Sequence, residues 1–250
     1  MCGSNGVTYD NPCEAQCAGV TYTHGACYVP TPTPTPEPGL IFHESFDNAS
    51  SITTNGGTVT GTAAKFTGGI YGNAIDLTSG GYVDYPITGT AARYNAAAGT
   101  ISFWVSTPSS AVGYFDIGRM LSTTPNSMGI YYPNNGYVIS EMDSGINQAW
   151  SAKSLPGVLP WHLITLTWYK SSSTCEVATT YIDGVPGAAK QYCNSFNPDL
   201  TKDMWVGRAN WYGNSNAKMD EFKIYNYTKT PTQVLTDYAT GVAAMLTEGW

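Results

Sequence analysis

The sequence has 250 residues, and its 11 basic and 18 acidic side chains give a formal net charge of −7 at pH 7. This acidic balance argues against binding to nucleic acid or to an anionic membrane surface. No apolar run approaches the ~20 residues needed to cross a bilayer. The length allows one large domain or one domain with a small appendage. Charged residues make up only 12% and aromatic residues 13% of the chain, which favours strands joined by short polar turns.

Six cysteines in a chain with a threonine- and proline-rich linker indicate an oxidising compartment. We therefore expect a secreted or cell-surface protein. Four of the cysteines frame the first 27 residues, and four cysteines permit three pairings between which the sequence does not choose. They are Cys2, Cys13, Cys17 and Cys27.

The run CGSNGVTYDNPC at Cys2–Cys13, with the later cysteines Cys17 and Cys27, resembles the second half of a Kazal domain. The resemblance implies a Cys2–Cys27 disulfide and leaves Cys13 and Cys17 to pair with each other. In Kazal inhibitors the protease-binding loop lies upstream of the position of Cys2, so we do not expect protease inhibition. Residues 1–28 are expected to form a truncated Kazal-like unit that acts as a spacer, a cap or a contact module.

Residues 29–39 contain proline at every second position from Pro30 to Pro38. Such alternation forces polyproline II, which predicts a semi-rigid strut of roughly 30 Å. Threonines in such stalks can carry O-linked sugars, so glycosylation of Thr31, Thr33 and Thr35 and a bare linker are both open. The sequons at Asn48 and Asn226 are possible N-glycosylation sites.

Alternating apolar residues predict a series of short strands after the linker. A turn at residues 133–136 is a hairpin signal, and a strand beginning at 205 leads into a loop at 211–214. The expected strands cover residues 40–47, two segments within 68–84, and then 100–106, 115–121, 128–132, 137–142, 162–169 and 219–226.

A hairpin between residues 175 and 193 turns at Asp183-Gly184-Val185. Cys175 and Cys193 lie nine positions either side of Gly184, so they face each other in antiparallel register. This spacing predicts a cross-strand disulfide.

A capping threonine, a proline and a glutamine at residues 230–233 begin a short helix that we expect to end near Thr240. Residues 242–250 form a C-terminal tail that could be the end of this helix, an extra strand or a segment that docks on a neighbour.

Asp220 has the parity of the apolar face of the last strand, which also carries Phe222 and Ile224. A carboxylate in such a row is costly unless donors or a cation compensate it. Asp220 therefore either caps a loop through backbone N–H groups or holds a calcium ion that joins the last strand to the first.

Six fragments in order resemble the laminin-G-like, concanavalin-A-like jelly roll: GGIYGNAIDL, TISFWV, WHLITLTW, YIDGVPG, MWVGR and MDEFKIYN. The resemblance covers about residues 40–238 and implies an all-β, two-sheet antiparallel jelly-roll sandwich, which we place at 40–241. Its laminarinase-related members imply a structural calcium ion held by Ser45, Gly72 and Asp220. The same sandwich carries lectins, adhesion modules, hydrolases and lyases, so it does not decide the function.

The sequence offers no complete catalytic set. Glu141-Met142-Asp143 begins the laminarinase-like motif Glu-x-Asp-x-x-Glu, but Ile146 stands where the second glutamate is needed. We interpret Glu141 and Asp143 as the end of a solvated hairpin, and His162 as structural rather than as a base. The chain is therefore expected not to be an enzyme.

Sugars stack on aromatic rings while amide side chains bind their hydroxyl groups. The loop around Trp211 and Tyr212, with Asn210 and Asn214, fits this description, and Tyr131 and Tyr132 are further candidates. Weaker ones are Tyr137 and Trp150. Four tryptophans are instead expected to pack in the core or at its rim: Trp104, Trp161, Trp168 and Trp205.

We therefore predict non-catalytic extracellular recognition, with a polysaccharide or glycoprotein glycan as the partner. One alternative is a structural subunit of an extracellular appendage, assembled through the N-terminal unit and the C-terminal tail. A second alternative is a diverged polysaccharide hydrolase or lyase.

Overall fold

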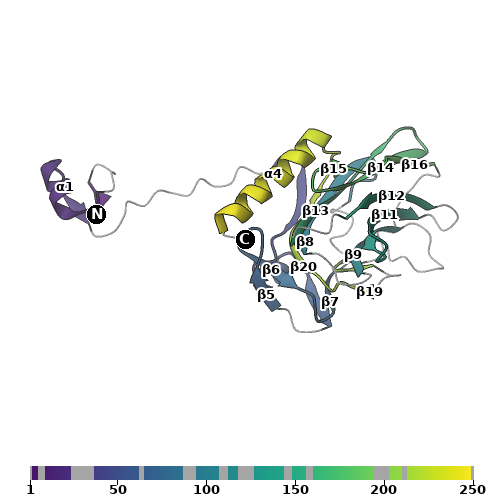
Figure 1. The fold of residues 1–250 in the computed structure, drawn as a ribbon, viewed down its shortest axis with the longest axis horizontal. Helices are drawn as coiled ribbons and strands as arrows, with labels where there is room; N and C mark the ends of the chain where they lie inside the picture. Colours follow the sequence, from purple (N-terminus) through teal and green to yellow (C-terminus); the bar gives the residue numbers. More distant parts are fainter. Residues whose placement is uncertain are drawn as a thin grey trace. The chain divides into compact units, whose positions relative to one another are not determined.

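The structure is a computed structural model, and its chain divides into two compact units, Met1–Glu37 and Pro38–Trp250 (Figure 1). We describe the two units separately. The described residues are 2–4, 9–23, 37–61, 65–86, 94–106, 112–117, 127–143, 148–155, 160–193, 203–209 and 213–248.

The small unit pairs β1 (Cys2–Gly3) with β2 (Tyr22–Thr23) and contains the helix α1 (Pro12–Cys17). The helix begins with a reciprocal cap. The Glu14 N–H donates to Asn11 Oδ1 at 3.0 Å, and the Asp10 N–H donates to the Glu14 carboxylate at 3.2 Å. One orphan donor of the first turn, the Glu14 N–H, is thereby satisfied, and Asp10 before the cap is tied to the helix. The Kazal resemblance of this unit stays a prediction.

The pairing of Cys13 with Cys17 is not formed. Both thiols are free and exposed on α1. Residues four apart on a helix have parallel Cα–Cβ bonds, and sulfur atoms on parallel bonds do not converge without backbone movement. Cys27 and the side chain of Cys2 lie outside the described part of the chain, so the Cys2–Cys27 bond stays a prediction. The linker threonines Thr31, Thr33 and Thr35 lie outside it as well.

The large unit is a sandwich of two antiparallel sheets, as predicted. The first sheet has seven strands in the order β12-β11-β10-β9-β17-β7-β4. Their bounds are β4 (Thr58–Gly61), β7 (Gly81–Tyr85), β9 (Val112–Ile117), β10 (Ser127–Tyr132), β11 (Tyr137–Asp143), β12 (Gln148–Ser154) and β17 (Met204–Val206).

The second sheet has nine strands, in the order β15-β14-β13-β8-β20-β6-β5, with β16 beside β14 and β3 beside β20. Their bounds are β3 (Leu40–Glu44), β5 (Lys65–Gly68), β6 (Asn73–Asp76), β8 (Ala98–Ser106), β13 (Trp161–Lys170), β14 (Cys175–Ile182), β15 (Val185–Pro186), β16 (Lys190–Cys193) and β20 (Lys218–Tyr225).

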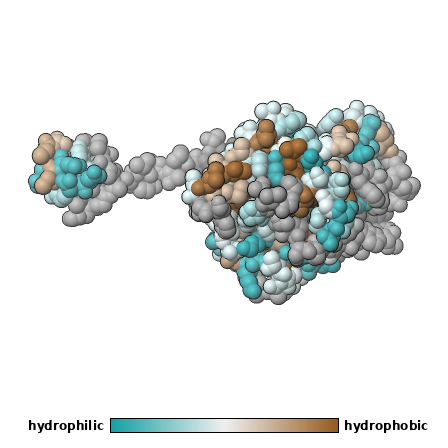
Figure 2. All heavy atoms as spheres, viewed as in Figure 1, coloured by the Kyte–Doolittle hydropathy of each residue, from teal (hydrophilic) through white to brown (hydrophobic). Residues whose placement is uncertain are grey.

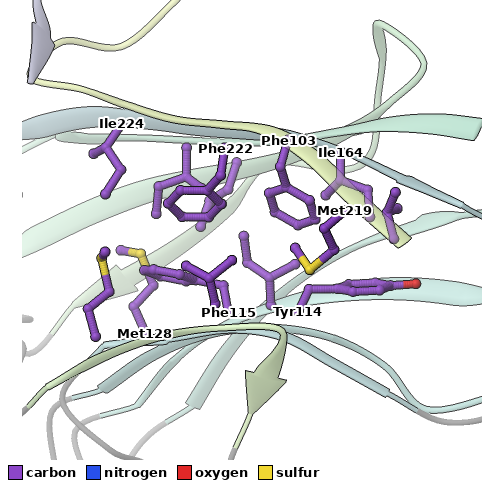
Figure 3. Packing of buried hydrophobic residues seen from close by; sticks show 14 of the residues in the cluster. Phe103, Tyr114, Phe115, Met128, Ile164, Met219, Phe222 and Ile224 are labelled. Carbon is purple, nitrogen blue, oxygen red and sulfur yellow. The ribbon is translucent and has the colours of Figure 1, made fainter. Parts of the chain in front are cut away.

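Apolar side chains from the facing sides of the two sheets fill the space between them (Figure 3). Phe222 of β20 stacks on Phe103 of its own sheet, with ring centroids 5.7 Å apart. It also stacks on Phe115 of the opposite sheet, with centroids 5.5 Å apart. Such aromatic pairs add to the free energy gained by burial, and this one ties the two sheets together.

Several elements that the sequence analysis missed are short or weakly patterned. The helix α2 (Ala49–Thr54) consists mostly of serine and threonine, and it forms because Asn48 Oδ1 accepts from the N–H groups of Ser50 and Ser51. Its Ile52 is buried. The strands β4 and β12 lack clear alternation and depend on pairing with β7 and β11.

The helix α4 (Pro231–Glu248) runs past the expected end near Thr240. Its start is confirmed: the Thr230 N–H donates to Gln233 Oε1 at 2.8 Å. It continues because the helix packs on Trp104. Tyr238 stacks on this indole, and glycine at 241 allows a close approach, since a Cβ atom there would lie only 2.1 Å from the indole. The segment after 241 is thus helical up to Glu248. No helix among the described residues is long and apolar enough to span a membrane.

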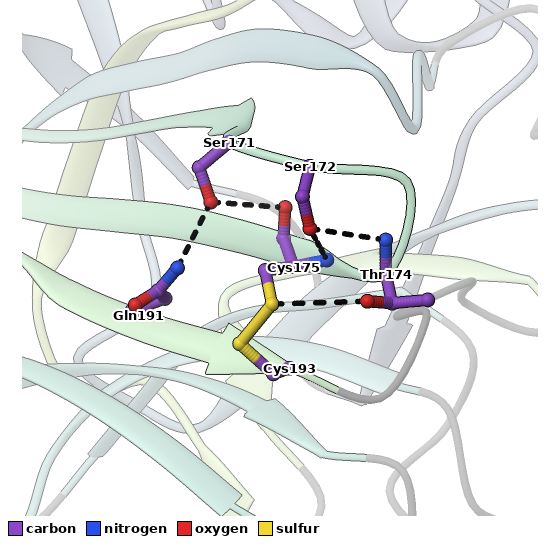
Figure 4. Close-up of a disulfide and its surroundings, with 6 residues drawn as sticks. All are labelled: Ser171, Ser172, Thr174, Cys175, Gln191 and Cys193. Atoms are coloured by element: carbon purple, nitrogen blue, oxygen red, sulfur yellow. Dashed lines mark hydrogen bonds between the residues drawn. A yellow bond between two sulfur atoms is a disulfide. The ribbon is translucent and has the colours of Figure 1, made fainter.

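The disulfide between Cys175 and Cys193 is confirmed (Figure 4). The two residues are register partners of β14 and β16. The loop that leads into β14 is ordered locally, since Ser172 Oγ accepts from the Cys175 N–H at 3.1 Å.

Replacing both Cys175 and Cys193 by alanine is expected to lower the free energy of unfolding by about 2–4 kcal/mol, because the bond restricts the unfolded chain. Urea denaturation of the full chain measures this. The double replacement Cys13→Ala, Cys17→Ala is the control and should leave the midpoint of the large unit unchanged. An equal midpoint for the Cys175/Cys193 variant and the unmodified chain would contradict the expectation.

Candidate functional site

Trp205 of β17 lies on the outer face of the seven-stranded sheet, as the alternation of side chains along the strand requires. Met204 and Val206 of β17 belong to the core, so Trp205 between them points to the opposite face. Trp205 is the register partner of Asp84 on one side and of Asp116 on the other. Trp205 is buried, as predicted for a residue of the core or the rim, but it lies outside both core clusters. The other three tryptophans, Trp104, Trp161 and Trp168, lie in the core as predicted.

A cation lies over this tryptophan. The ring of Tyr82 meets that of Trp205 edge to face at 5.6 Å. The Arg208 guanidinium carbon lies 4.5 Å from the Trp205 ring centroid and 4.8 Å from that of Tyr82. Both distances are within the range of cation–π attraction. The two rings thus hold the guanidinium in place.

Arg208 begins a short hairpin of β18 (Arg208–Ala209) and β19 (Gly213–Asn214). Arg208 and Asn214 are register partners, so their side chains project from the same face. Gly207 precedes the hairpin with a positive φ of 85°, which breaks the alternation of β17. Its N–H donates to the Tyr114 carbonyl at 2.7 Å, which ties the hairpin to β9.

The hairpin backbone also packs directly on β9. A Cβ atom at Gly113 would lie 1.8 Å from the Ala209 nitrogen, so only glycine admits this approach. We call the group formed by Tyr82, Trp205, Arg208 and Asn214 the Arg208 site.

The charged and polar ends of the Arg208 site are open. Within the described part of the chain, the guanidinium of Arg208 has no hydrogen bond or ion pair. Its Nε is buried without a partner, whereas the terminal nitrogens are not among such buried atoms and so reach solvent. Asn214 is exposed. These groups are therefore available to a ligand.

The predicted binding residues have different outcomes. Asn214 lies in the Arg208 site, while Asn210, Trp211 and Tyr212 lie outside the described residues, in the loop of the same hairpin. The sequence analysis missed Arg208, although a cation three residues after a tryptophan and just before an aromatic loop was a usable signal.

Tyr131 does not present its hydroxyl to a ligand. It is buried and donates to Glu141 Oε2 at 2.7 Å, while Tyr132 is half-buried against the core. The interpretation of Glu141 as the end of a solvated hairpin is wrong, because this side chain is only 3% exposed. In register, Gly129 lies between Glu141 and Asp116. The side chains of Asp143 and Trp150 lie outside the described residues.

His162 is structural, as predicted. It is fully buried, and its Nδ1 lies 2.8 Å from Asp183 Oδ2, whose other oxygen accepts from the Leu163 N–H at 3.0 Å. The pair fixes the β14–β15 turn against β13.

Asp220 caps a loop, which was one of its two predicted roles. Its Oδ2 accepts from the N–H groups of Ile70 at 2.6 Å and Tyr71 at 3.2 Å, and its Oδ1 accepts from the Glu221 N–H at 2.9 Å. A Cβ atom at Gly69 would lie 2.5 Å from Oδ2, so only glycine fits beside it. Burial raises the pKa of Asp220 to about 8, against the lowering effect of the three N–H donors.

Asp47 holds the same turn from its other end. Its Oδ1 accepts from the Asn73 N–H at 3.0 Å, and a Cβ atom at Gly72 would lie 2.3 Å from this oxygen. The hydroxyl of Ser45 accepts from the Asp47 N–H at 3.4 Å. The predicted calcium ligands Ser45 and Gly72 thus lie beside Asp47, which the sequence analysis missed.

Some carboxylate oxygens of Asp47 and Asp220 at this turn are free to bind calcium, and others are already engaged in hydrogen bonds. Asp47 Oδ2 has no hydrogen bond in the described part of the chain, and Asp220 Oδ1 accepts just one. Asp220 Oδ2, however, already accepts two, and no group of three or more His, Cys, Asp or Glu side chains that could hold a metal occurs among the described residues. Any calcium ion here would depend on backbone carbonyls and water.

The sequon asparagines Asn48 and Asn226 are both exposed. Asn48 caps α2 through its oxygen, so its amide nitrogen stays outward. Glycosylation of either residue stays a prediction.

A family model described as the concanavalin A-like lectin/glucanases superfamily matches residues 77–235. A search of curated proteins found no match. Among solved structures, the chain is similar to domain 4 of an extracellular arabinanase from Geobacillus stearothermophilus, solved in complex with arabinotriose. That match has a TM-score of 0.59 and 19% identity, and it covers 80% of this chain and 98% of that domain.

The receptor-binding domain of botulinum neurotoxin type G is also similar, with a TM-score of 0.58 and 14% identity over 81% of this chain. The binding domain of Paraclostridial mosquitocidal protein 1 has a TM-score of 0.57 and 16% identity over 81% of this chain. The matched part spans about half of each of these two toxin domains, 51% and 52%. At these identities the likeness establishes the fold alone.

In buffer containing a chelator, the contribution of Asp220 to the melting temperature is expected to fall as the pH rises from about 4 to about 8. The folded chain keeps the Asp220 proton in this window, whereas the unfolded chain, with its ordinary carboxyl pKa of 3.8, has lost it. Unfolding therefore releases a proton, and a higher pH favours unfolding. Asp220→Asn should flatten this part of the profile, which thermal unfolding over a pH series measures.

The variant Glu221→Gln is the control, because the pKa of Glu221 is shifted in the opposite direction to that of Asp220. Burial acts to raise the pKa of Glu221, but hydrogen bonds from His43 and Lys223 outweigh it, so the net pKa is lowered. This carboxylate therefore stabilises the fold above its ordinary pKa of 4.5, and its loss should matter more at neutral than at acid pH. A pH profile unchanged by Asp220→Asn would contradict the assignment to Asp220.

Proposed function

The chain belongs to the concanavalin A-like lectin/glucanases superfamily, and on that premise we propose that it recognises glycans outside the cell without cleaving them. The Arg208 site on the outer face of the seven-stranded sheet is the contact region. The ligand is an extracellular polysaccharide or the glycan of a glycoprotein.

The observation that carries this proposal is the open guanidinium of Arg208. It is held over the rings of Tyr82 and Trp205 and makes no hydrogen bond or ion pair in the described part of the chain. Its buried Nε–H has no partner, although buried polar groups are normally paired, and its terminal nitrogens reach solvent, where a ligand can accept hydrogen bonds from them. Beside it, Asn214 offers a donor and an acceptor to sugar hydroxyl groups.

The solved relatives support binding as the activity. The arabinanase domain was solved with arabinotriose, and two of the toxin domains are described as receptor-binding or binding domains. This fold also carries glycoside hydrolases, so the fold by itself leaves catalysis open.

The burial of Glu141 favours binding over cleavage. A retaining glycosidase needs two carboxyl groups about 5–5.5 Å apart that reach the substrate. Glu141 is 3% exposed and accepts a hydrogen bond from Tyr131, and Asp116 is 1% exposed. Neither carboxyl group is open to a sugar.

Export fits the chemistry of the chain. The Cys175–Cys193 disulfide is stable in an oxidising compartment. The threonine- and proline-rich linker suits a protein that presents its large unit away from a surface.

Self-assembly into an extracellular appendage is a second candidate, and the surface of α4 favours it. Leu235 is 52% exposed and Leu246 is 73% exposed. Figure 2 shows hydrophobic residues along this helix. Sedimentation velocity that finds a monomer across a concentration series would exclude this candidate.

A structural calcium ion at the turn of residues 69–73 is part of the proposal. Asp47, Asp220 and the carbonyls of Ser45 and Gly72 would hold it, and it would supply charge compensation to the buried carboxylate of Asp220.

Calcium at one hundred times its dissociation constant should stabilise the chain by about 2.7 kcal/mol, with the larger thermal shift at alkaline pH, where Asp220 is ionised. Asp47→Asn should remove the shift. Asp76→Asn, which changes a carboxylate on β6 outside this turn, is the control. If calcium leaves the melting temperature of the unmodified chain unchanged, the proposed calcium site at the turn of residues 69–73 is contradicted.

A glycan array probed with the full chain tests the main proposal, and Asn214→Ala and Tyr82→Ala are expected to weaken binding about 3- to 10-fold each. Tyr169→Ala is the matched control, because Tyr169 is 44% exposed but lies on the other sheet. A reducing-sugar assay should show no release from any bound polysaccharide. Release that disappears in Glu141→Gln would overturn the non-catalytic assignment.

A further inference from the structure

Charge at the Arg208 site distinguishes between classes of sugar. Arg208 is a half-buried cation, and among the described residues its guanidinium contacts the faces of two aromatic rings and forms no ion pair. The carboxylates next to Trp205 in register, Asp84 and Asp116, engage other groups, and neither forms an ion pair with this guanidinium. Within the described part of the chain, no carboxylate therefore forms an ion pair with this positive charge.

We propose that the Arg208 site selects glycans that carry an anionic group, either the carboxylate of a uronic acid or a sulfate ester. This inference rests on the proposed function and adds the class of ligand to it. The planar fork of a guanidinium matches a carboxylate or a sulfate with two parallel hydrogen bonds. A neutral sugar can use the same donors, but it leaves the charge unmet.

The geometry prepares Arg208 for such a bond. The two rings lie 4.5 and 4.8 Å from the guanidinium carbon, measured to the ring centroids, and hold it in place, so little side-chain freedom is lost on binding. Burial of Nε turns the terminal nitrogens toward solvent as the available donors. Asn214, the register partner on the same face of the hairpin, can bind a neighbouring hydroxyl group and so distinguish a sugar acid from a free anion.

The acidity of the whole chain does not exclude an anionic ligand. The net charge of −7 is spread over 250 residues. Charges farther than about 8–10 Å away are largely screened at physiological ionic strength. The contact with Arg208 is direct and partly desolvated, so it is screened much less. Charge-assisted hydrogen bonds are roughly twice as strong as neutral ones, so the local contact decides the preference.

Two matched pairs of probes test the inference by isothermal titration with the full chain. The first pair is trigalacturonate and its methyl ester, which differ in the charge of the carboxyl groups. The second pair is a sulfated carrageenan oligosaccharide and an unsulfated agarose oligosaccharide. Arabinotriose is added as a neutral probe. The acidic member of at least one pair should bind about 10- to 100-fold more tightly than its neutral partner.

The variants assign the preference to one side chain. Arg208→Gln should abolish the difference within the pair, and Arg208→Lys should keep part of it, because it retains the charge but loses the fork. Lys190→Gln removes one exposed positive charge from the other sheet and should change nothing. Thermal unfolding of each variant confirms that it is folded.

The outcomes separate the two levels of the proposal. Equal binding of acidic and neutral members that is lost in Arg208→Gln would overturn the anionic preference and leave glycan recognition standing. A preference that survives Arg208→Gln would overturn the assignment to this site. Binding of none of these probes, together with a blank glycan array, would refute glycan recognition itself.

Discussion

The carboxylate of Asp220, buried at the centre of the nine-stranded sheet, is the constraint around which the large unit is built. It belongs to β20, the strand that pairs with β3, β6 and β8. Desolvation of an acid is costly, and the three backbone N–H donors offset part of that cost. The donors come from Glu221 beside it and from the turn of residues 69–73, so this turn cannot move without leaving Asp220 unsatisfied. The strand order around β20 follows from this fixed point.

The candidate site depends on the same strand. The chain leaves the seven-stranded sheet at β17 and enters the nine-stranded sheet at β20, and the hairpin with Arg208 and Asn214 lies between them. Its two ends are tied together, because the Ser215 N–H donates to the Gly207 carbonyl. Ala217, just before β20, accepts from the Leu77 N–H at 3.2 Å. The segment that connects the two sheets thus places the guanidinium of Arg208 and the amide of Asn214 at a defined position on the outer face of the seven-stranded sheet.

Alternation and spacing were sufficient for the strands of the sandwich and for the Cys175–Cys193 bond, because these depend on neighbours along one strand or one hairpin. They left two roles open for Asp220, because its donors Ile70 and Tyr71 lie far earlier in the chain. They were insufficient where the outcome depends on pairing between distant strands. Parity could tell that Trp205 faces away from Met204, but not which of the two faces is the core. The positive φ at Gly207 interrupts the alternation, so the direction of Arg208 could not be read from β17. Glu141 looked like a hairpin end because the sequence shows its position near the end of β11, but not that its face of the sheet is covered.

The most direct test of the central claim is an NMR titration of the full chain with a bound oligosaccharide. The account predicts that the largest shifts occur at the Arg208 Nε–H, at the side-chain amide of Asn214 and at the indole of Trp205, on the outer face of the seven-stranded sheet. Shifts confined to α4 or to the outer face of the nine-stranded sheet would show that the ligand binds elsewhere and would contradict the account.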